Sequence, residues 1–299
     1  MKGGNHIRQQ ILIPLAGNTP IKIRYGKESV SPETYYDYIH DHHFLEVCLI
    51  ISGKMLHFAS GKTYSLKFGD VFFCRSRELH YALAAEASVY ERYAFWLPMN
   101  AFSWLEGGDD AALGVFSDSR YSDTNVLRIR PGSEERYLKI LEELKKCISS
   151  DSGIAPLCVV GKLAELLVFI NNEAGCPDDL LNEKPQQMPA LIFNIIRYVR
   201  QNYRTISGID EVAANFYTNK DYMTRVFKRH TGFTVHDYLR SVRISKSKIL
   251  LKKGKGVTET AFSCGFNSTS YFIRVFEKAT GLTPSKYRAS GKEIIENKE

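Results

Sequence analysis

Two segments in the last third of the chain carry charged and hydroxyl side chains suited to contact the edges of DNA bases. When the sequence is aligned with itself at an offset of 49, residues 222–238 match residues 271–287 at 8 of 17 positions, which is too many for chance. In both copies these polar residues alternate with apolar ones at helical spacing. Arginine can bond bidentately to guanine, and threonine or isoleucine can contact the methyl group of thymine. The repeat therefore predicts two similar base-contacting surfaces.

Each copy is predicted to form a short helix, a turn and a second helix. In the first copy Asn219 can cap the second helix, and in the second copy Ser268 can do so after a turn at Gly265. Such helix-turn-helix units place their second helix in the major groove of B-DNA. The alternative is a helical repeat, or a protein-binding helix pair, with solvated polar faces.

The distribution of charge favours the nucleic-acid interpretation. Residues 186–299 hold 20 Lys and Arg against 9 Asp and Glu, a net charge of +11, whereas residues 1–185 hold 20 against 24, a net charge of −4. A basic domain joined to a nearly neutral one indicates a polyanionic partner for the basic domain alone. We expect double-stranded DNA rather than a membrane, because no helix there pairs a Lys/Arg face with a Trp/Phe/Leu face.

Residues 265–288 resemble the C-terminal signature of AraC/XylS-type transcription regulators. The match includes Gly265-Phe266, Ser270-Tyr271-Phe272 and the run from Thr280 to Arg288, and the resemblance extends over residues 190–289. It implies two helix-turn-helix units joined by a long helix at about Val235 to Lys252, with the two recognition helices in successive major-groove segments. The DNA-binding set that follows from the resemblance and from the outward faces is Lys220, Asp221, Thr224, Arg225, Ser268, Thr269, Ser270, Ile273 and Arg274.

The N-terminal region has the pattern of a small β-barrel or sandwich. Short β-rich runs are expected at residues 46–51, 55–59, 63–68, 71–74 and 89–97, separated by Ser-Gly and Gly-Asp turns. Residues 25–104 contain 17 of the 36 aromatic residues, which either fill a core or line a pocket.

A change to helical periodicity after Pro131-Gly132 predicts two amphipathic helices, the first from about residue 134 to 148 and the second from about 157 to 171. They can pack on the barrel, which is the default, or on a second copy of themselves. Residues 175–189 contain three prolines among acids and amides and are expected to be a linker. The predicted domains are thus a barrel at 1–130, a helical dimerisation or packing segment at 131–174, the linker, and a DNA-binding domain at 190–299.

A second resemblance concerns the barrel. His40, His42 and Glu46 with Gly53 seven residues after the Glu, followed by Gly69-Asp70 and His80, resemble the two cupin motifs. In metal-binding cupins these ligand types converge, and imidazole with carboxylate suits Fe, Mn, Ni or Zn. Sensor domains of AraC-type regulators share the fold and usually bind a small effector without metal. Three interpretations of the quartet stay open: effector contacts, a divalent metal, or structural polar residues at the barrel mouth. His43 and His57 are expected to lie off the site.

Taken together, the sequence predicts an α+β protein of two domains: a cupin-like β-barrel with trailing helices and an all-α double helix-turn-helix. We expect a cytoplasmic, ligand-responsive transcription regulator without enzymatic activity or an obligatory cofactor. Its expected partners are DNA, a small effector such as a sugar, a second copy of the chain, and RNA polymerase if it is an activator. The alternatives are a cupin metalloenzyme with a basic localising domain, and a regulator controlled by a protein partner. The six cysteines form no CxxC pair and are expected to be buried reduced thiols.

Overall fold

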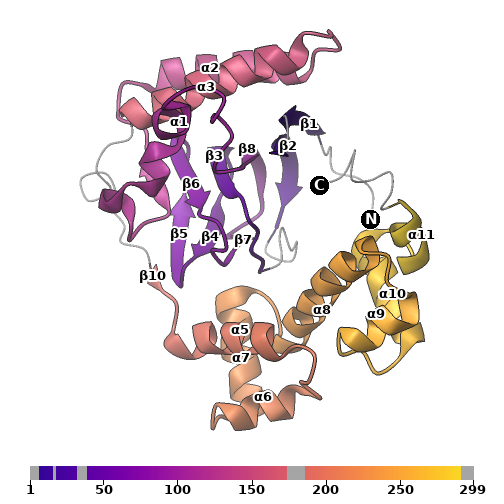
Figure 1. The fold of residues 1–299 in the computed structure, drawn as a ribbon. Coiled ribbons are helices and arrows are strands. Elements are labelled where there is room, and N and C mark those ends of the chain that lie inside the picture. Colours follow the sequence, from indigo (N-terminus) through magenta and orange to yellow (C-terminus); the bar gives the residue numbers. More distant parts are fainter. Residues whose placement is uncertain (1–6, 16–17, 32–38, 174–185, 291–299) are drawn as a thin grey trace. The chain divides into compact units, whose positions relative to one another are not determined.

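The computed structural model describes residues 7–15, 18–31, 39–173 and 186–290, and it divides the chain into a sensor unit up to Gln187 and a reader unit from Met188 (Figure 1). The two units are described separately. Most of the predicted linker, residues 175–185 of 175–189, lies outside the described residues, as does Cys176.

The sensor unit is built from two antiparallel sheets. The larger sheet has the order β1-β2-β8-β3-β6-β9 and the smaller one the order β10-β5-β4-β7. The strands span Ile7–Leu15 (β1), Asn18–Val30 (β2), Leu45–Ser52 (β3), Met55–Ala59 (β4), Lys62–Leu66 (β5), Asp70–Cys74 (β6), His80–Ala84 (β7), Ser88–Leu97 (β8), Val126–Arg128 (β9) and Gln186–Gln187 (β10).

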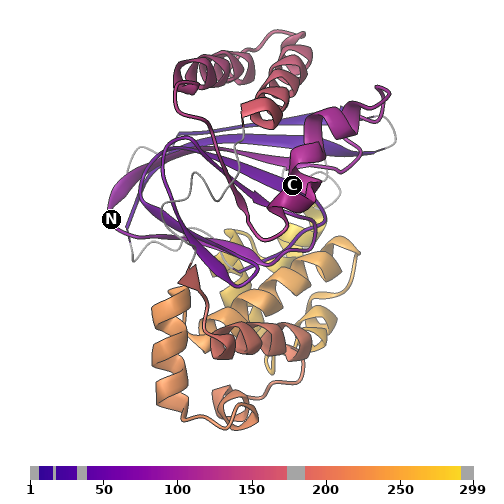
Figure 2. The same cartoon turned by 90° about the vertical axis from the view of Figure 1, so that its left-hand side faces the viewer.

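Three helices cover the outer face of the larger sheet (Figure 2): α1 (Gly108–Ser117), α2 (Glu134–Ile148) and α3 (Ala155–Glu173). The short 3-10 helix η1 (Ser119–Tyr121) follows α1. Alternation along β3 divides its side chains between two cores, because successive residues of a strand point to opposite faces. Val47 and Leu49 pack with the helices, whereas Cys48 and Ile50 pack inside the barrel. The central strand β3 is therefore buried on both faces.

The helix α3 is long and apolar enough to cross a membrane when judged by length and composition. One face of α3, including Val159, Leu163 and Leu166, is part of the core beneath the larger sheet, so the apolar composition of that face is explained by packing inside the protein.

The reader unit consists of α5 (Ala190–Asn202), α6 (Ile209–Asn215), α7 (Lys220–Thr231), α8 (Val235–Lys252), α9 (Val257–Ser263), α10 (Thr269–Thr280) and α11 (Pro284–Ser290). The predicted caps are present. The Asn219 side chain accepts hydrogen bonds from the backbone of Asp221 and Tyr222, and Ser268 accepts one from Tyr271. The joining helix α8 has the predicted bounds.

The turn before α10 depends on Gly265, whose φ is +83°. A Cβ atom there would lie 2.6 Å from the carbonyl oxygen of Arg204 and 2.9 Å from that of Tyr203. Only glycine fits this turn, because both the left-handed conformation and the close approach of backbone exclude a side chain. In the shorter first turn, Tyr217 takes the left-handed conformation with φ of +49° and is 99% exposed.

Three of the described cysteines are buried, namely Cys48, Cys74 and Cys264. The expectation of buried thiols is wrong for Cys158, which is exposed on α3, and Cys147 is half-buried. All five described cysteines are reduced.

Candidate functional sites

The structure brings His40, His42, Glu46 and His80 together at one end of the barrel. Each offers one nitrogen or oxygen atom, and these four atoms lie within 4.8 Å of one another. Glu46 projects from β3, and His80 begins β7. His40 lies in the segment before β3 and is joined to His80 at the start of β7 by an isolated antiparallel bridge. In this bridge the backbones of His40 and His80 exchange two hydrogen bonds of 3.0 Å. This bridge holds the His40 and His80 rings 4.2 Å apart, centroid to centroid.

Backbone carbonyls fix two of the imidazoles. His42 Nδ1 lies 3.2 Å from the carbonyl oxygen of Phe44, and His80 Nδ1 lies 2.8 Å from that of Glu78. A carbonyl accepts but cannot donate, so in both rings Nδ1 carries the proton. Nε2 of His42 is 2.7 Å and Nε2 of His80 3.3 Å from Glu46 Oε2. Both rings thus present Nε2 to one carboxylate oxygen.

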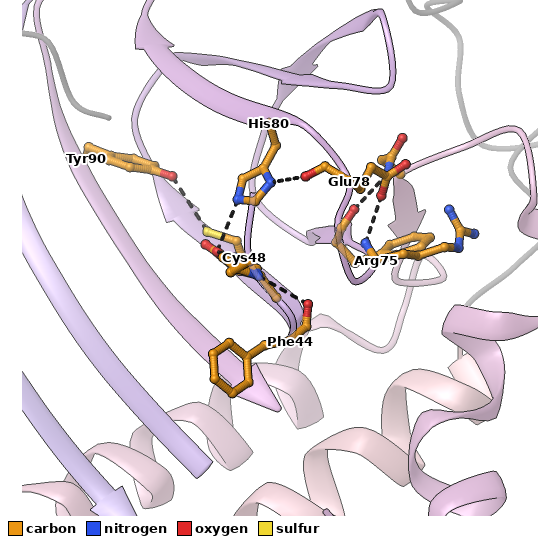
Figure 3. A network of polar contacts seen from close by, with 10 residues as sticks. Phe44, Cys48, Arg75, Glu78, His80 and Tyr90 are labelled. Carbon is orange, nitrogen blue, oxygen red and sulfur yellow. Dashed lines mark hydrogen bonds and ion pairs between the residues drawn. The ribbon is translucent and has the colours of Figure 1, made fainter. Parts of the chain in front are cut away.

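The loop that orients His80 is itself held by hydrogen bonds (Figure 3). The Glu78 carboxylate accepts from the backbone of Arg75 and from the Asn125 side chain, each at 2.8 Å. The Arg75 guanidinium donates to three backbone carbonyls, those of Phe116, Thr124 and Tyr121. Arg75 therefore anchors this loop.

Glu46 is ionised in this environment. Burial alone would raise the pKa of its carboxyl, but the contacts with His42 and His80 hold that pKa well below its usual value. The quartet therefore contains a carboxylate rather than a carboxylic acid at neutral pH.

The motif residues Gly53 and Asp70 have structural roles. Gly53 has a φ of +106°, and a Cβ atom there would lie 2.9 Å from the Cα of Tyr90. Asp70 is fully buried and pairs with Arg128, with Oδ1 2.6 Å from Nε. They shape the barrel around the quartet and do not belong to it.

A cavity of roughly 440 Å³, including its opening to solvent, lies inside the barrel beside the quartet. Glu46 and His80 form part of its wall. Its lining comes from strands of both sheets and consists of Arg24, Glu46, Cys48, His57, Phe72, His80, Tyr81, Ala82, Tyr90, Arg92, Ala94 and Trp96. The aromatic residues of the sensor therefore serve both purposes considered from the sequence: some fill the core beneath the helices, and others line this pocket.

His57 lies outside the quartet, as expected, but its side chain lines the neighbouring cavity, which the sequence did not predict. Its Nε2 lies 3.0 Å from the Tyr90 hydroxyl, and its ring packs on Phe72. Burial lowers the pKa of His57 to about 3, so the imidazole is neutral. Its inward position depends on the pairing of β4 with β7, which aligns His57 with Ala82. The sequence could have indicated this position, because His57 alternates with Leu56 and Phe58 in β4 and therefore shares a face with Met55 and Ala59.

In the first helix-turn-helix, Lys220, Asp221 and Arg225 are exposed on α7, and Thr224 is half-buried. Lys220 Nζ lies 2.9 Å from the carboxylate of Asp210 on α6. The inner side of the helix is formed by Met223 and Phe227, which are fully buried (Met223 0%, Phe227 0% exposed).

In the second helix-turn-helix, Ser270 and Arg274 are exposed on α10, and Thr269 is half-buried. Ile273 is half-buried too, because it packs against the core formed around Phe272 and Phe276. Ser268 is engaged in capping α10.

The two arginines have equivalent surroundings in the two copies. Arg225 lies over the ring of Tyr222 at 5.9 Å, and Arg274 lies over the ring of Tyr271 at 5.5 Å. The repeat thus preserves an Arg-Tyr pair three residues apart on each second helix, a feature that the sequence comparison contained as two identities but did not single out.

Comparisons with known proteins agree with this geometry. A family model described as an AraC-like ligand binding domain matches residues 25–167, and one described as a helix-turn-helix domain matches residues 212–290. The chain is 26% identical over 255 residues to the HTH-type transcriptional activator RhaR of Enterobacter sp. (strain 638), covering 83% of this chain and 86% of the relative. It is 24% identical over 258 residues to RhaR of Salmonella dublin, with the same coverage.

Among solved structures, ToxT from Vibrio cholerae bound to a naphthalenyl butenoic acid is 16% identical, with a TM-score of 0.36, covering 90% of this chain and 99% of that one. A sensor unit that matches a ligand-binding model and a reader unit that matches a helix-turn-helix model account for most of the described residues. The chain is therefore an AraC-family regulator, a ligand-responsive DNA-binding protein with a cupin-like sensor and a double helix-turn-helix reader.

Proposed function

We propose that the protein activates transcription when a small polyhydroxylated effector, such as a sugar, occupies the cavity of the sensor. The observation that carries this proposal is the cavity itself, which combines charged and hydrogen-bonding groups with aromatic rings. Arg24, Glu46 and His57 offer donors and acceptors to hydroxyl groups, and Trp96 and Tyr81 offer flat apolar surfaces to a sugar ring. Activation is the activity named for the RhaR relatives, and it implies contact with RNA polymerase.

The reader unit is proposed to bind two successive segments of the major groove. Arg225 and Arg274 are the best candidates for base contacts, because both are exposed on second helices and are in equivalent positions. Lys220, Asp221, Thr224, Thr269 and Ser270 lie on the same helices and complete the surface. Ser268 and Ile273 are proposed to support it, the first as a cap and the second through its packing.

A homodimer is proposed to form through the outer face of α3. Apolar or small residues follow one another at spacings of three and four along this face: Ile154, just before the helix, then Leu157, Gly161, Ala164 and Val168. Ile154 is 66% and Leu157 75% exposed. This spacing is that of a coiled-coil seam, and the small residues at its centre permit close approach of a second α3. We also propose that the protein acts on DNA in the cytoplasm as a regulator and not as an enzyme.

The effector proposal is tested by DNA binding. Duplexes selected by the full-length protein from a random pool provide the site, and the dissociation constant is then measured with a panel of sugars. We expect at least one sugar to change the dissociation constant for DNA tenfold or more. The Trp96→Ala variant should lose this response but bind DNA as the wild type does when no sugar is present. If no sugar alters DNA binding or the melting temperature, the effector class is wrong. Turnover of a sugar that is lost in His42→Ala would favour the metalloenzyme alternative.

A further inference from the structure

We propose that Cys147 on α2 and Cys158 on α3 form an oxidisable thiol pair, which hydrogen peroxide converts to a disulfide between the two helices. The two cysteines come from different helices, and their side chains share a hydrogen bond. Both are reduced in the structure. Neither belongs to the quartet or lines the effector cavity, so the pair is a separate site that does not depend on the proposed effector.

An ion pair fixes the register in which α2 and α3 pack against each other. The segment 149–154 joins the two helices, and so short a connection makes neighbouring helices antiparallel. Lys162 Nζ on α3 lies 2.5 Å from the carboxylate of Glu143 on α2. One helical turn closer to the connection, position 147 on α2 therefore faces position 158 on α3. The contact between the two cysteines thus follows from helix packing.

The two thiols differ in exposure, which gives them different roles. Cys158 is exposed to solvent, whereas Cys147 is half-buried and packs against the core of the sensor. Burial raises the pKa of the Cys147 thiol above its ordinary value, so this thiol is protonated at neutral pH. Oxidant from solvent therefore reaches Cys158 first, and Cys147 lies beside it as the resolving thiol that oxidisable cysteines often have.

The chemistry has two balanced steps. The Cys158 thiolate attacks one oxygen of hydrogen peroxide and the O–O bond breaks, which leaves a sulfenic acid on the sulfur; the departing hydroxide takes up a proton and becomes water. The Cys147 sulfur then attacks the Cys158 sulfur, an S–S bond forms, and the sulfenic hydroxyl leaves with the Cys147 proton as a second water. Two thiols are oxidised to one disulfide while one peroxide is reduced to two waters.

The position of the pair gives the disulfide a consequence for the proposed dimer. Cys147 is in the last turn of α2 and Cys158 in the first turn of α3, directly after Leu157 of the proposed α3 seam. A crosslink there fixes the start of the seam against α2, so we expect oxidation to change the dimer dissociation constant. This consequence rests on the proposed dimer, whereas disulfide formation does not. In the cytoplasm such disulfides are usually transient and serve catalysis or redox sensing.

The experiment treats reduced full-length protein with hydrogen peroxide, alkylates the remaining thiols in denaturant and maps disulfides by mass spectrometry of a non-reduced digest. We expect most wild-type chains to contain a Cys147–Cys158 disulfide that dithiothreitol reverses. Cys147→Ser should instead keep a sulfenic acid at Cys158, which dimedone labels, because the resolving thiol is gone. Cys158→Ser should form neither product. Cys176→Ser is the matched control and should form the same disulfide as the wild type.

Circular dichroism establishes that each variant is folded. The proposal is overturned if peroxide leaves Cys147 and Cys158 unlinked in the folded wild type, or if the mapped disulfide joins Cys158 to Cys176 or to a second chain. It is also overturned if Cys147→Ser shows no sulfenic acid at Cys158. Sedimentation of the reduced and oxidised wild type keeps the two ideas apart. A dimer dissociation constant that oxidation leaves unchanged removes only the effect on the seam, and a reduced protein that is monomeric contradicts the dimer proposal and not the disulfide.

Discussion

At the scale of single residues, His57 and Glu46 show how one barrel interior treats two titratable groups differently. Glu46 keeps its charge because imidazoles surround it. His57 is neutral because burial outweighs its attraction to Glu46. A neutral buried histidine makes folding sensitive to acid, since the unfolded chain binds a proton that the folded chain refuses.

The His57→Gln variant should therefore lose less stability in acid than the wild type. The pKa of His57 is about 3 in the folded protein against 6.5 for the ordinary side chain. Between these values the unfolded state binds more protons, so the free energy of unfolding falls as the pH is lowered, by up to about 1.4 kcal/mol per pH unit. Urea unfolding of metal-free protein at pH 7, 6 and 5 measures this slope. Equal slopes for wild type and His57→Gln would contradict the assignment, and the exposed His43→Gln is the control.

Base-reading and core residues of the reader should respond differently to truncation. Arg225→Ala and Arg274→Ala are each expected to weaken binding to the preferred DNA site by about 1–3 kcal/mol, because a bidentate base contact is lost. Their melting temperatures should change little, since both side chains are exposed. Phe276→Ala, at a fully buried position, should cost about 3–5 kcal/mol of stability. Similar melting of both kinds of variant would show that the inward and outward assignments are wrong.

At the scale of elements, the two turns of the repeat differ in what they demand. Gly265→Ala should destabilise the reader unit by more than about 1 kcal/mol, because the added methyl group would meet backbone oxygens at 2.6 and 2.9 Å. Gly208→Ala is the matched control, with φ of −174° and no atom within 4 Å of the added Cβ; it loses only the preference of the α6 N-cap for glycine over alanine, and it should destabilise the unit less than Gly265→Ala. Thermal unfolding compares the two. A neutral Gly265→Ala would mean that this turn can relax.

The helices of the reader could be predicted from the sequence because their signals are local. Caps at Asn219 and Ser268 and the 3.6-residue period give the bounds of α7 and α10. In the sensor, β3 to β6 and β8 were expected, but β1, β2, β7, α1 and β9 were not. The strand β7 is five residues long and follows turn residues, and α1 begins with a glycine and two acids and has no side-chain cap. Such elements are decided by tertiary pairing.

The same distinction applies to the site. The spacing of His40, His42 and Glu46 could be read from one segment, but His80 joins them through a β-bridge between residues forty positions apart. The motif resemblance supplied that connection. No local pattern shows that His57, Tyr90 and Arg92 share a cavity with them, because two separate sheets must first close around it.

At the scale of the whole molecule, the excess positive charge lies in the same unit as the proposed DNA-binding surface. The reader unit, which begins at Met188, is compact, and residues 186–299 carry a net charge of +11. The fragment 188–299 should bind duplex DNA, and the logarithm of its affinity should fall linearly with the logarithm of salt concentration as counterions are released from phosphates. Fluorescence anisotropy from 50 to 300 mM salt measures the slope. An affinity independent of salt would contradict the electrostatic account.

The dimer proposal predicts a change in mass. Leu157→Glu places a charge at a seam residue of α3 that is 75% exposed and should raise the dimer dissociation constant at least tenfold, because an unpaired charge is then buried at the interface. Sedimentation equilibrium of the full-length protein measures this. Val89→Glu, on β8 and 47% exposed, should leave the mass unchanged. A wild type that stays monomeric at 100 µM would show that the seam has another partner.

The alternation along β3 means that only a single β-sheet separates the effector cavity from the helical layer. Glu46 lines the proposed effector cavity, and its covalent neighbour Val47 is packed, with no exposed surface, in the core shared with α2 and α3. Close-packed cores transmit displacement, because they contain little free volume to absorb it. A ligand that draws Glu46 inward therefore pulls on the layer that carries the α3 seam. Glu46 and Val47 are covalent neighbours, so we expect a displacement of the Glu46 backbone to shift this packed layer directly.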